Sequence, residues 1–207
     1  MSICYIKRLS EDATLGLWQI SESWQELNEQ LQLSDNDQQI LESKKTENRK
    51  KEWLACRVLL HSMAPETGDI SYDENRKPHI SGSSQYISMS HSGDFVSVYL
   101  HKQQSVGVDI QKMKPSISKG ADYFLNSSEQ EWVDISDNLI MHLIWSAKES
   151  AFKYAGNPDL DLKKHIVTKQ FSSNQNGVIE VSIDNADFKS VMVSYDTFED
   201  YVLTWTQ

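Results

Sequence analysis

The sequence predicts an α+β fold built from two lobes of similar size. Helical patterns and short β-rich runs follow one another along the 207 residues in the order helices, sheet, helices, sheet. The β-rich runs are short and are separated by Asn, Asp, Gly and Ser, which favours small antiparallel sheets. We therefore expect a first lobe over residues 1–104 and a second lobe over residues 105–207.

The first lobe is expected to begin with a short strand and a helix that reach Leu33. Ser34 is a typical N-cap for the next helix, and acidic residues follow it in the favourable first turn. A further helix should run to about Met63, after a break in the polar stretch 42–52.

Three β-rich runs then follow, at residues 86–90, 95–100 and 106–110. Because the connections between them are short, we expect an antiparallel meander in which the third run returns to the end of the first. This arrangement predicts that His91 lies beside Asp109, at a separation of two strand spacings.

The second lobe is expected to contain helices over residues 127–133 and 138–155, the latter ended by Gly156 as a left-handed C-terminal residue. In the C-terminal part of the sequence, apolar and polar residues alternate in the pattern of β-strands. Its four runs cover residues 165–171, 177–183, 190–195 and 201–206.

Composition and charge narrow the class of protein. Hydrophobic residues make up 39% of the chain and aromatic residues 10%, which is typical of a folded globular protein. The 20 Lys and Arg against 30 Asp and Glu leave a net charge of −10, which argues against nucleic-acid and anionic membrane partners. Residues 44–57 oppose this sign, with six basic and two acidic residues and a local net charge of +4. A phosphorylated small ligand therefore remains possible at a local basic site.

The chain lacks the signals of export and of membrane insertion. No apolar run approaches the ~18 residues that span a bilayer, and the first residues lack the apolar core and cleavage site of a signal peptide. Cys4 and Cys56 have neither metal-ligand spacing nor a disulfide framework. We expect two buried thiols and a cytoplasmic protein.

The helical segment WSAKESAFKYAG, residues 145–156, is the most informative stretch. Trp145, Glu149 and Phe152 share one helix face, and Lys153 lies one turn after Glu149. One interpretation is a solvated Glu–Lys pair that stabilises the helix by a few tenths of a kcal/mol. The other is a functional carboxylate, because a Glu beside aromatic rings is costly to desolvate unless a cation holds it.

The segment GVDIQ, residues 107–111, supplies a second carboxylate at the end of a strand, where Gly107, Asp109 and Gln111 share one face. Asp109 alone could simply begin a turn. Together with Glu149 it forms the kind of two-carboxylate site that Mg²⁺ uses together with substrate phosphates.

Two shorter motifs carry candidate phosphate ligands. Ser90 and His91 lie at the end of the first β-rich run, and Pro78 favours an extended backbone at Lys77. Structural loop residues are the alternative interpretation for all three. With residues 44–57, Lys148 and Lys153, they would make the site basic within an acidic protein.

In this order the motifs resemble the 4'-phosphopantetheinyl transferase family, in its two-lobed type that resembles the surfactin-synthetase activator. The resemblance covers about residues 49–153. It rests on the segments RVLL (57–60), KP (77–78), SHS (90–92), GVDI (107–110) and WSAKESAFK (145–153).

The family resemblance implies a fold and an activity. The fold would be a pseudo-dimer of two similar lobes, each a small antiparallel sheet packed with helices, with the active site between them. The activity would be the Mg²⁺-dependent transfer of the 4'-phosphopantetheine arm of coenzyme A to a serine of an acyl, peptidyl or aryl carrier protein, with release of 3',5'-ADP. A pseudo-dimer has no need to self-associate, so we expect a monomer.

The resemblance also implies roles for individual residues. Asp109 and Glu149 would bind Mg²⁺, Glu149 would act as the base, and Lys153 would offset charge on the phosphate. The residues implied to hold coenzyme A are Arg49, Arg57, Lys77, Ser90, His91 and Lys153.

One position departs from the family pattern. Many relatives have an acidic residue where this chain has Gln111, whose amide is a weaker metal ligand through its carbonyl or through water. A non-catalytic homologue that binds coenzyme A or a carrier protein is therefore the alternative. A Mg²⁺-dependent pyrophosphate hydrolase would explain the carboxylates but not the SHS and KP segments.

Overall fold

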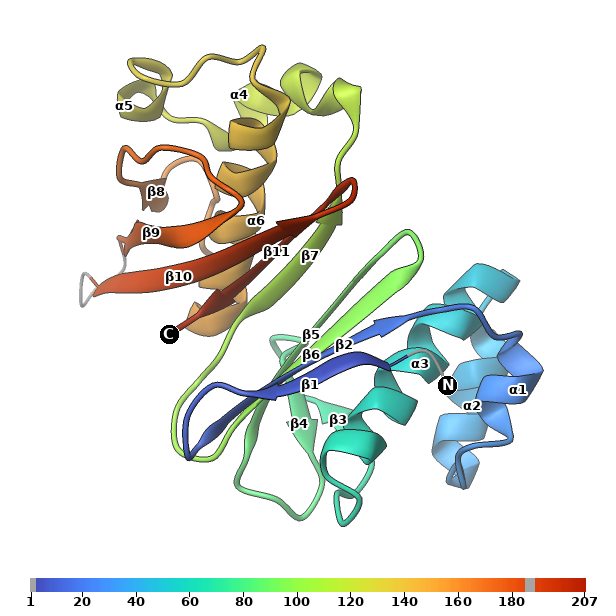
Figure 1. The fold of residues 1–207 in the computed structure, drawn as a ribbon. Helices are drawn as coiled ribbons and strands as arrows, with labels where there is room; N and C mark the ends of the chain where they lie inside the picture. Colours follow the sequence, from blue (N-terminus) through green and yellow to red (C-terminus); the bar gives the residue numbers. More distant parts are fainter. Residues whose placement is uncertain (1–2, 185–188) are drawn as a thin grey trace. The chain divides into compact units, whose positions relative to one another are not determined.

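The structure is a computed structural model, and it describes residues 3–184 and 189–207. The chain divides into two compact units, Met1–Gln104 and Ser105–Gln207. Each unit combines one antiparallel sheet with helices (Figure 1), so the predicted α+β class is confirmed. Within the described residues no helix is long and apolar enough to cross a membrane.

The first unit is a six-stranded sheet with the strand order β1-β2-β6-β5-β4-β3. Its strands are β1 Ile3–Arg8, β2 Ala13–Gln19, β3 Ile70–Tyr72, β4 Pro78–Ile80, β5 Tyr86–Ser92 and β6 Phe95–His101. Its helices are α1 Trp24–Asn28, α2 Asp35–Ser43 and α3 Glu47–Met63. As predicted, Ser34 caps α2, where its side chain accepts a hydrogen bond from the backbone of Asp37.

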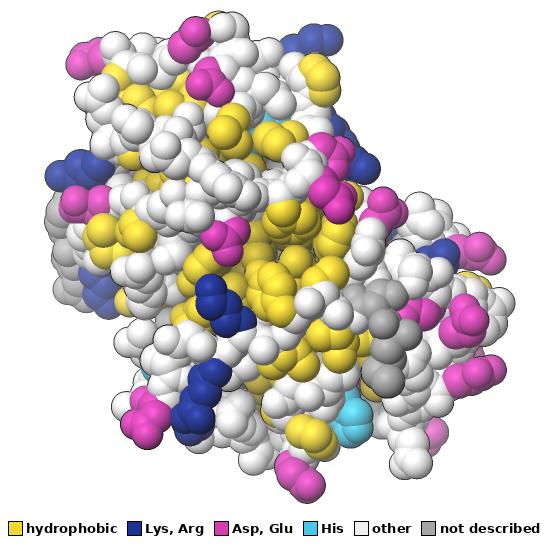
Figure 2. All heavy atoms as spheres, in the orientation of Figure 1, with side chains coloured by type: hydrophobic (Ala, Val, Ile, Leu, Met, Phe, Trp, Pro, Cys, Tyr) yellow, Lys and Arg dark blue, Asp and Glu magenta, His cyan; other side chains and the backbone are white. Residues whose placement is uncertain are grey.

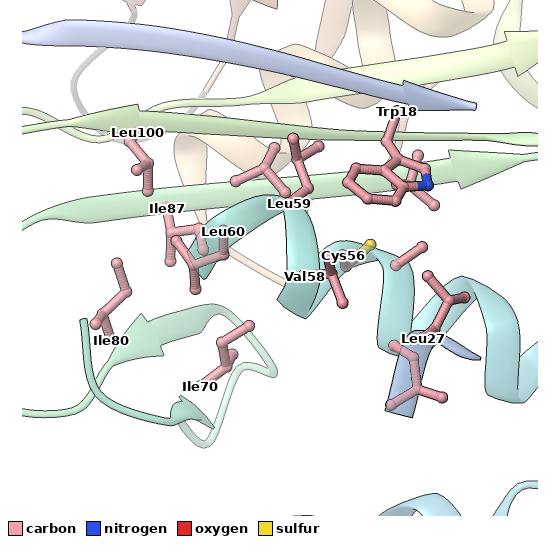
Figure 3. Close-up of a cluster of buried hydrophobic side chains, with 14 of the residues drawn as sticks. Trp18, Leu27, Cys56, Val58, Leu59, Leu60, Ile70, Ile80, Ile87 and Leu100 are labelled. Atoms are coloured by element: carbon pink, nitrogen blue, oxygen red, sulfur yellow. The ribbon is translucent and has the colours of Figure 1, made fainter. Parts of the chain in front are cut away.

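The core of the first unit lies between α3 and one face of this sheet. Leu59 and Leu60 of α3 meet Trp18, Ile87 and Leu100 of the strands, and all five side chains are buried (Figure 3). This packing fixes which face of the sheet and which side of α3 can carry polar functional groups.

The second unit is a five-stranded antiparallel sheet with the order β7-β11-β10-β9-β8. Its strands are β7 Val108–Lys112, β8 Ile166–Thr168, β9 Asn176–Ile183, β10 Lys189–Phe198 and β11 Tyr201–Thr206. Its helices are η1 Pro115–Gly120, α4 Ala121–Phe124, α5 Ser127–Gln130 and α6 Asn138–Ala155. The long helix α6 runs along one face of the sheet (Figure 1).

Local signals predicted several elements correctly. Helix α6 spans the predicted residues 138–155, with Asp137 as its N-cap and Gly156 as its left-handed C-cap, at φ 64°. The four tail strands are also present, although the helix predicted over 127–133 is shorter.

Three predictions were wrong. Residues 3–19 form a hairpin of two strands rather than one strand. Cys4 is exposed in β1, whereas Cys56 is buried as expected. The meander is wrong as well, because β5 and β6 pair with each other but β7 pairs with β11 in the other sheet. The argument that placed His91 beside Asp109 therefore does not hold.

Helix α6 lies unusually close to β7 at Gly107. A Cβ atom on this residue would overlap the carbonyl oxygen of Ser150 and would crowd the backbone nitrogen of Tyr154. Glycine is required here for a close approach of two backbones, not for a left-handed conformation. The contact places the polar face of β7 directly against the helix.

We expect Gly107→Ala to destabilise the protein by about 3 kcal/mol or more, because two backbone segments must move apart to admit the methyl group. Urea unfolding at neutral pH measures this loss. Gly120→Ala is the matched control, since nothing lies within 4 Å of an added Cβ there, and it should change the stability by less than about 1 kcal/mol. Equal stability of the two variants would contradict the proposed role of Gly107.

Candidate functional site

The site in the second unit is built around Asp109, which is only 6% exposed. Lys153 of α6 donates from Nζ to Asp109 Oδ1 (2.9 Å) and to the carbonyl oxygen of Val108 (2.8 Å). Ser146, two turns earlier on the helix, donates to Asp109 Oδ2 (2.9 Å). Both carboxylate oxygens are thus held by donors from one helix, which fixes the orientation of the carboxyl plane.

Glu149 lies on α6 between these two donors and is largely buried. Burial raises the pKa of Glu149, the charge of Asp109 adds to this rise and Lys153 opposes it, so that the pKa lies at about 7. Asp109 thus lies close enough for its charge to act on the Glu149 carboxyl group. Two acids that share a single cation are a typical functional arrangement, because one of them keeps its proton near neutral pH.

The donor set fits a hard divalent cation. Asp109 and Glu149 offer carboxylate oxygens, and Mg²⁺ is commonly held by one or two carboxylates together with substrate phosphates and water. No group of three or more His, Cys, Asp or Glu side chains with metal-binding proximity occurs among the described residues. The protein part of such a site would therefore consist of two acids and, at most, neutral ligands.

Gln111 is the neutral candidate next to this pair. It lies two residues beyond Asp109 on β7, on the same face of the strand, and is partly buried. Its side-chain amide donates to the carbonyl oxygen of Lys112 (3.4 Å). The carbonyl end of the side chain is then the part that could face a cation or a water molecule.

The first unit brings together a second group of candidate residues on α3 and β5. Arg49 donates from Nη1 to Glu52 Oε2 (3.0 Å) and lies 3.4 Å from Nε2 of His91. His91 Nδ1 lies 3.4 Å from the same Glu52 oxygen. Because the side chains of Arg49 and His91 remain 62% and 39% exposed, an anion could reach both.

Ser90 and His91 lie on opposite faces of β5. His91 shares the α3 face with Ile87 and Met89, which pack in the core, and Ser90 lies on the other face, 8% exposed. The side chains of the SHS segment therefore do not form one cluster.

Lys77 lies where the turn between β3 and β4 ends. Asp73 holds this turn, since its Oδ1 accepts hydrogen bonds from the backbone nitrogens of Asn75 (2.9 Å) and Lys77 (2.8 Å). Burial lowers the pKa of Lys77, with the charge of Asp73 opposing this. The lysine is thus a partly desolvated cation at a rigid position, which suits an anionic ligand.

Arg57 is already engaged within the protein. Its guanidinium donates from Nε to Asp37 Oδ2 (2.9 Å) and lies 3.4 Å from the ring centre of Trp53. The buried Asp37–Arg57 pair forms part of the wall of a cavity of about 450 Å³, which Leu60 and Ile70 also line. Arg57 thus has a structural role in the first unit.

Several cations of the +4 segment already have partners within the protein. Arg49 and Arg57 are paired with acids, and Lys50 lies 4.5 Å from the ring centre of Trp24. On the face in Figure 2, Lys and Arg side chains lie in separate groups among acidic ones. These pairings reduce the number of cations in residues 44–57 that are available to a ligand.

Lys148 was expected to add positive charge at the site, and this was wrong. Its side chain is completely buried and donates to Glu129 Oε2 (2.6 Å) and to the carbonyl oxygens of Phe124 and Leu162. Glu129 also accepts hydrogen bonds from the backbone and side chain of Thr168 (2.8 and 2.7 Å). The Lys148–Glu129 pair ties α6 to α5 within the protein.

Sequence reasoning missed the hydroxyl groups behind Asp109. Ser146 and Ser150 lie one turn apart in the WSAKES segment, and Thr204 of β11 lies opposite Asp109 in the sheet. A signal was present in YVLTWT, residues 201–206, where two threonines interrupt an apolar strand. That signal could not indicate which carboxylate the hydroxyls would serve.

Comparisons with known proteins bear on this site. Residues 105–206 match the model of the 4'-phosphopantetheinyl transferase superfamily. The chain is 30% identical over 115 residues to the 4'-phosphopantetheinyl transferase AcpT of Salmonella typhimurium, and 32% identical over 116 residues to the AcpT of Escherichia coli K12. These matches cover 52% of this chain and span 60% and 59% of the length of the two relatives.

The raised pKa of Glu149 predicts a pH-dependent stability. The folded protein keeps the Glu149 proton up to pH about 7, whereas the unfolded chain releases it near the usual value of 4.5. The folded state thus binds more protons between these limits, so the Glu149 contribution to stability falls as the pH rises through this window.

In urea unfolding without divalent cations, we expect Glu149→Gln to gain stability relative to wild type between pH 5 and pH 8, by up to about 3 kcal/mol. Glu180→Gln is the control, because Glu180 lies on the face of β9 opposite the buried core positions Ile179 and Val181. A Glu149→Gln stability curve parallel to that of wild type would contradict the assignment.

Proposed function

Because the chain belongs, through residues 105–206, to the 4'-phosphopantetheinyl transferase superfamily, we propose that the protein transfers the 4'-phosphopantetheine arm of coenzyme A to a serine of an apo carrier protein. The carrier would be of the acyl, peptidyl or aryl type. The observation that carries this proposal is the arrangement of the buried Asp109 with the partly buried Glu149 and Lys153. The reaction would require Mg²⁺ and would release 3',5'-ADP.

The proposed step transfers one phosphoryl-linked group. The serine oxygen of the carrier attacks the β-phosphorus of coenzyme A, and a P–O bond forms there while the P–O bond to 3',5'-ADP breaks. Glu149 takes the proton of the serine hydroxyl, a role for which a pKa of about 7 suits a base at neutral pH. Lys153, held beside Asp109, offsets negative charge on the phosphate.

Asp109 and Glu149, with Gln111 through its carbonyl or through water, would hold the Mg²⁺. When bound, the cation neutralises the pyrophosphate and stabilises the charge that develops during transfer. The two carboxylates would then face a positive charge, which relieves their mutual repulsion.

The first unit would bind the phosphates of coenzyme A. The exposed guanidinium of Arg49, the imidazole of His91 and the partly desolvated Lys77 support this role. Ser90 and Arg57 belong to the same proposed set. Arg57 would act near the adenosine end, by keeping its pairing with Asp37 and shaping the cavity wall.

We further propose that the protein works as a monomer in the cytoplasm. Neither Cys4 nor Cys56 is in a disulfide in the part of the chain that the structure describes, which supports a reducing compartment.

The experiment is to incubate the protein with Mg²⁺, coenzyme A and a panel of apo carrier proteins that includes one from the same genome, and to weigh the products. We expect one phosphopantetheine to be added to at least one carrier. Asp109→Asn and Glu149→Gln should each lower the rate by at least about 100-fold, because each removes a charged oxygen ligand. Glu180→Gln should keep the wild-type rate.

Two other results would replace the proposal. Coenzyme A binding without transfer to any carrier would identify a non-catalytic homologue, for which Gln111 is the supporting observation. Release of 3',5'-ADP in the absence of a carrier would identify a pyrophosphate hydrolase.

A further inference from the structure

A chain of buried hydroxyl groups lies behind the Asp109 carboxylate. Thr204 Oγ1 lies 2.6 Å from Ser150 Oγ, 3.0 Å from Ser146 Oγ and 2.9 Å from the carbonyl oxygen of Ser146. All three side chains are 0% exposed. They join β11 to two successive turns of α6 and end at Asp109.

Each hydroxyl group has one proton, and this limits which group in the series donates a hydrogen bond to which. A carboxylate can only accept hydrogen bonds, so Ser146 donates its single hydroxyl proton to Asp109 Oδ2. Thr204 then donates to the carbonyl or the hydroxyl oxygen of Ser146, and Ser150 donates to the hydroxyl or the carbonyl oxygen of Thr204. In either case Thr204 contacts Ser146, through its hydroxyl or its carbonyl oxygen, and Ser146 in turn orients the carboxylate.

Thr204 places a hydroxyl group where an apolar side chain would also fit. The position is completely buried in a strand whose neighbours Leu203 and Trp205 are apolar, and Val would have nearly the same shape. A buried hydroxyl costs free energy unless its hydrogen bonds are made. The Thr204 hydroxyl makes these bonds with Ser146 and Ser150, and among the described residues Asp109 is the only carboxylate that this series of hydroxyls reaches.

We propose that Thr204 is a positioning residue, which acts through Ser146 to hold the Asp109 carboxylate in the orientation that a divalent cation requires. This inference rests on the metal site of the proposed function. Mg²⁺ demands nearly ideal octahedral geometry, so a ligand that can rotate binds it less well. Lys153 holds the other oxygen of Asp109, and the carboxyl plane is fixed only when both donors are in place.

The test measures the affinity of the protein alone for Mn²⁺, a paramagnetic substitute for Mg²⁺, by electron paramagnetic resonance. We expect Thr204→Val to raise the Mn²⁺ Kd about tenfold, the range found when the partners of metal ligands are removed. Thr204→Ser, which keeps the hydroxyl, should restore an affinity close to wild type. Thermal unfolding confirms that each variant is folded.

Thr206→Val is the matched control. Thr206 lies two residues along the same strand, is also buried, and accepts a hydrogen bond from the backbone of Gly107 (3.0 Å) rather than serving the carboxylate. We expect this variant to lose stability while its Mn²⁺ affinity stays close to wild type. An equal loss of affinity in the Thr204→Val and Thr206→Val variants would overturn the proposal, since a general loss of packing would explain both.

A double-mutant cycle tests whether Thr204 acts on Asp109 through Ser146. Ser146→Ala should weaken Mn²⁺ binding as much as Thr204→Val, and the double variant should lose no more than either single variant, because both act through one carboxylate. Additive losses would overturn the proposed sequence of contacts. Unchanged affinity in Thr204→Val, or equal losses in Thr204→Val and Thr204→Ser, would overturn the role of the hydroxyl.

The Mn²⁺ measurement needs neither coenzyme A nor a carrier, so it is separable from the transferase assay. A protein that binds Mn²⁺ in a Thr204-dependent way but modifies no carrier would retain this inference and lose the proposed function. If the protein is an active transferase but its Mn²⁺ affinity does not change in Thr204→Val, the proposed function stands and this inference is wrong. A wild-type protein that binds no Mn²⁺ would contradict the inference and the metal site together.

Discussion

The close approach of α6 to β7 at Gly107 is the constraint on which the site depends. The Ser150 carbonyl occupies the space that a Cβ atom would need, so the helix and the strand are in backbone contact at that point. Asp109, one pleat further along the same face, is then within reach of Ser146 and Lys153. A helix displaced by the width of a methyl group would lengthen both hydrogen bonds, and the carboxylate would lose its fixed plane.

That proximity has an electrostatic cost. Asp109 and Glu149 lie near one cation, Lys153, and burial together with the charge of Asp109 raises the pKa of Glu149 to about 7. A structural ion pair would need only one acid for one base, and the Lys148–Glu129 pair on the same helix has that composition, completely buried and extensively hydrogen-bonded. The surplus acid at Asp109–Glu149 is therefore better explained by a ligand with positive charge than by stability.

Elements with local signals were predictable from the sequence, and elements with distant partners were not. The capping residues Asp137 and Gly156 delimit α6 within the sequence itself. The β7 strand has a clear pattern, but its partner β11 lies about a hundred residues later, so short connections wrongly favoured β6 as its neighbour. The same holds around the candidate site. Sequence motifs proposed the pair of Asp109 and Glu149, whereas Thr204, the β11 neighbour of Asp109, and Glu129, the partner of Lys148, come from remote segments.

Gln111 is consistent with this balance of charges. A third acid beside Asp109 and Glu149 would add repulsion in a buried site that already holds more negative than positive charge. An amide offers a carbonyl oxygen without that cost, but it also attracts a cation less strongly. In the proposed metal site, much of the affinity would then come from how well the two carboxylates are oriented, so the donors Ser146, Thr204 and Lys153 would contribute more in this chain than in one with three acids.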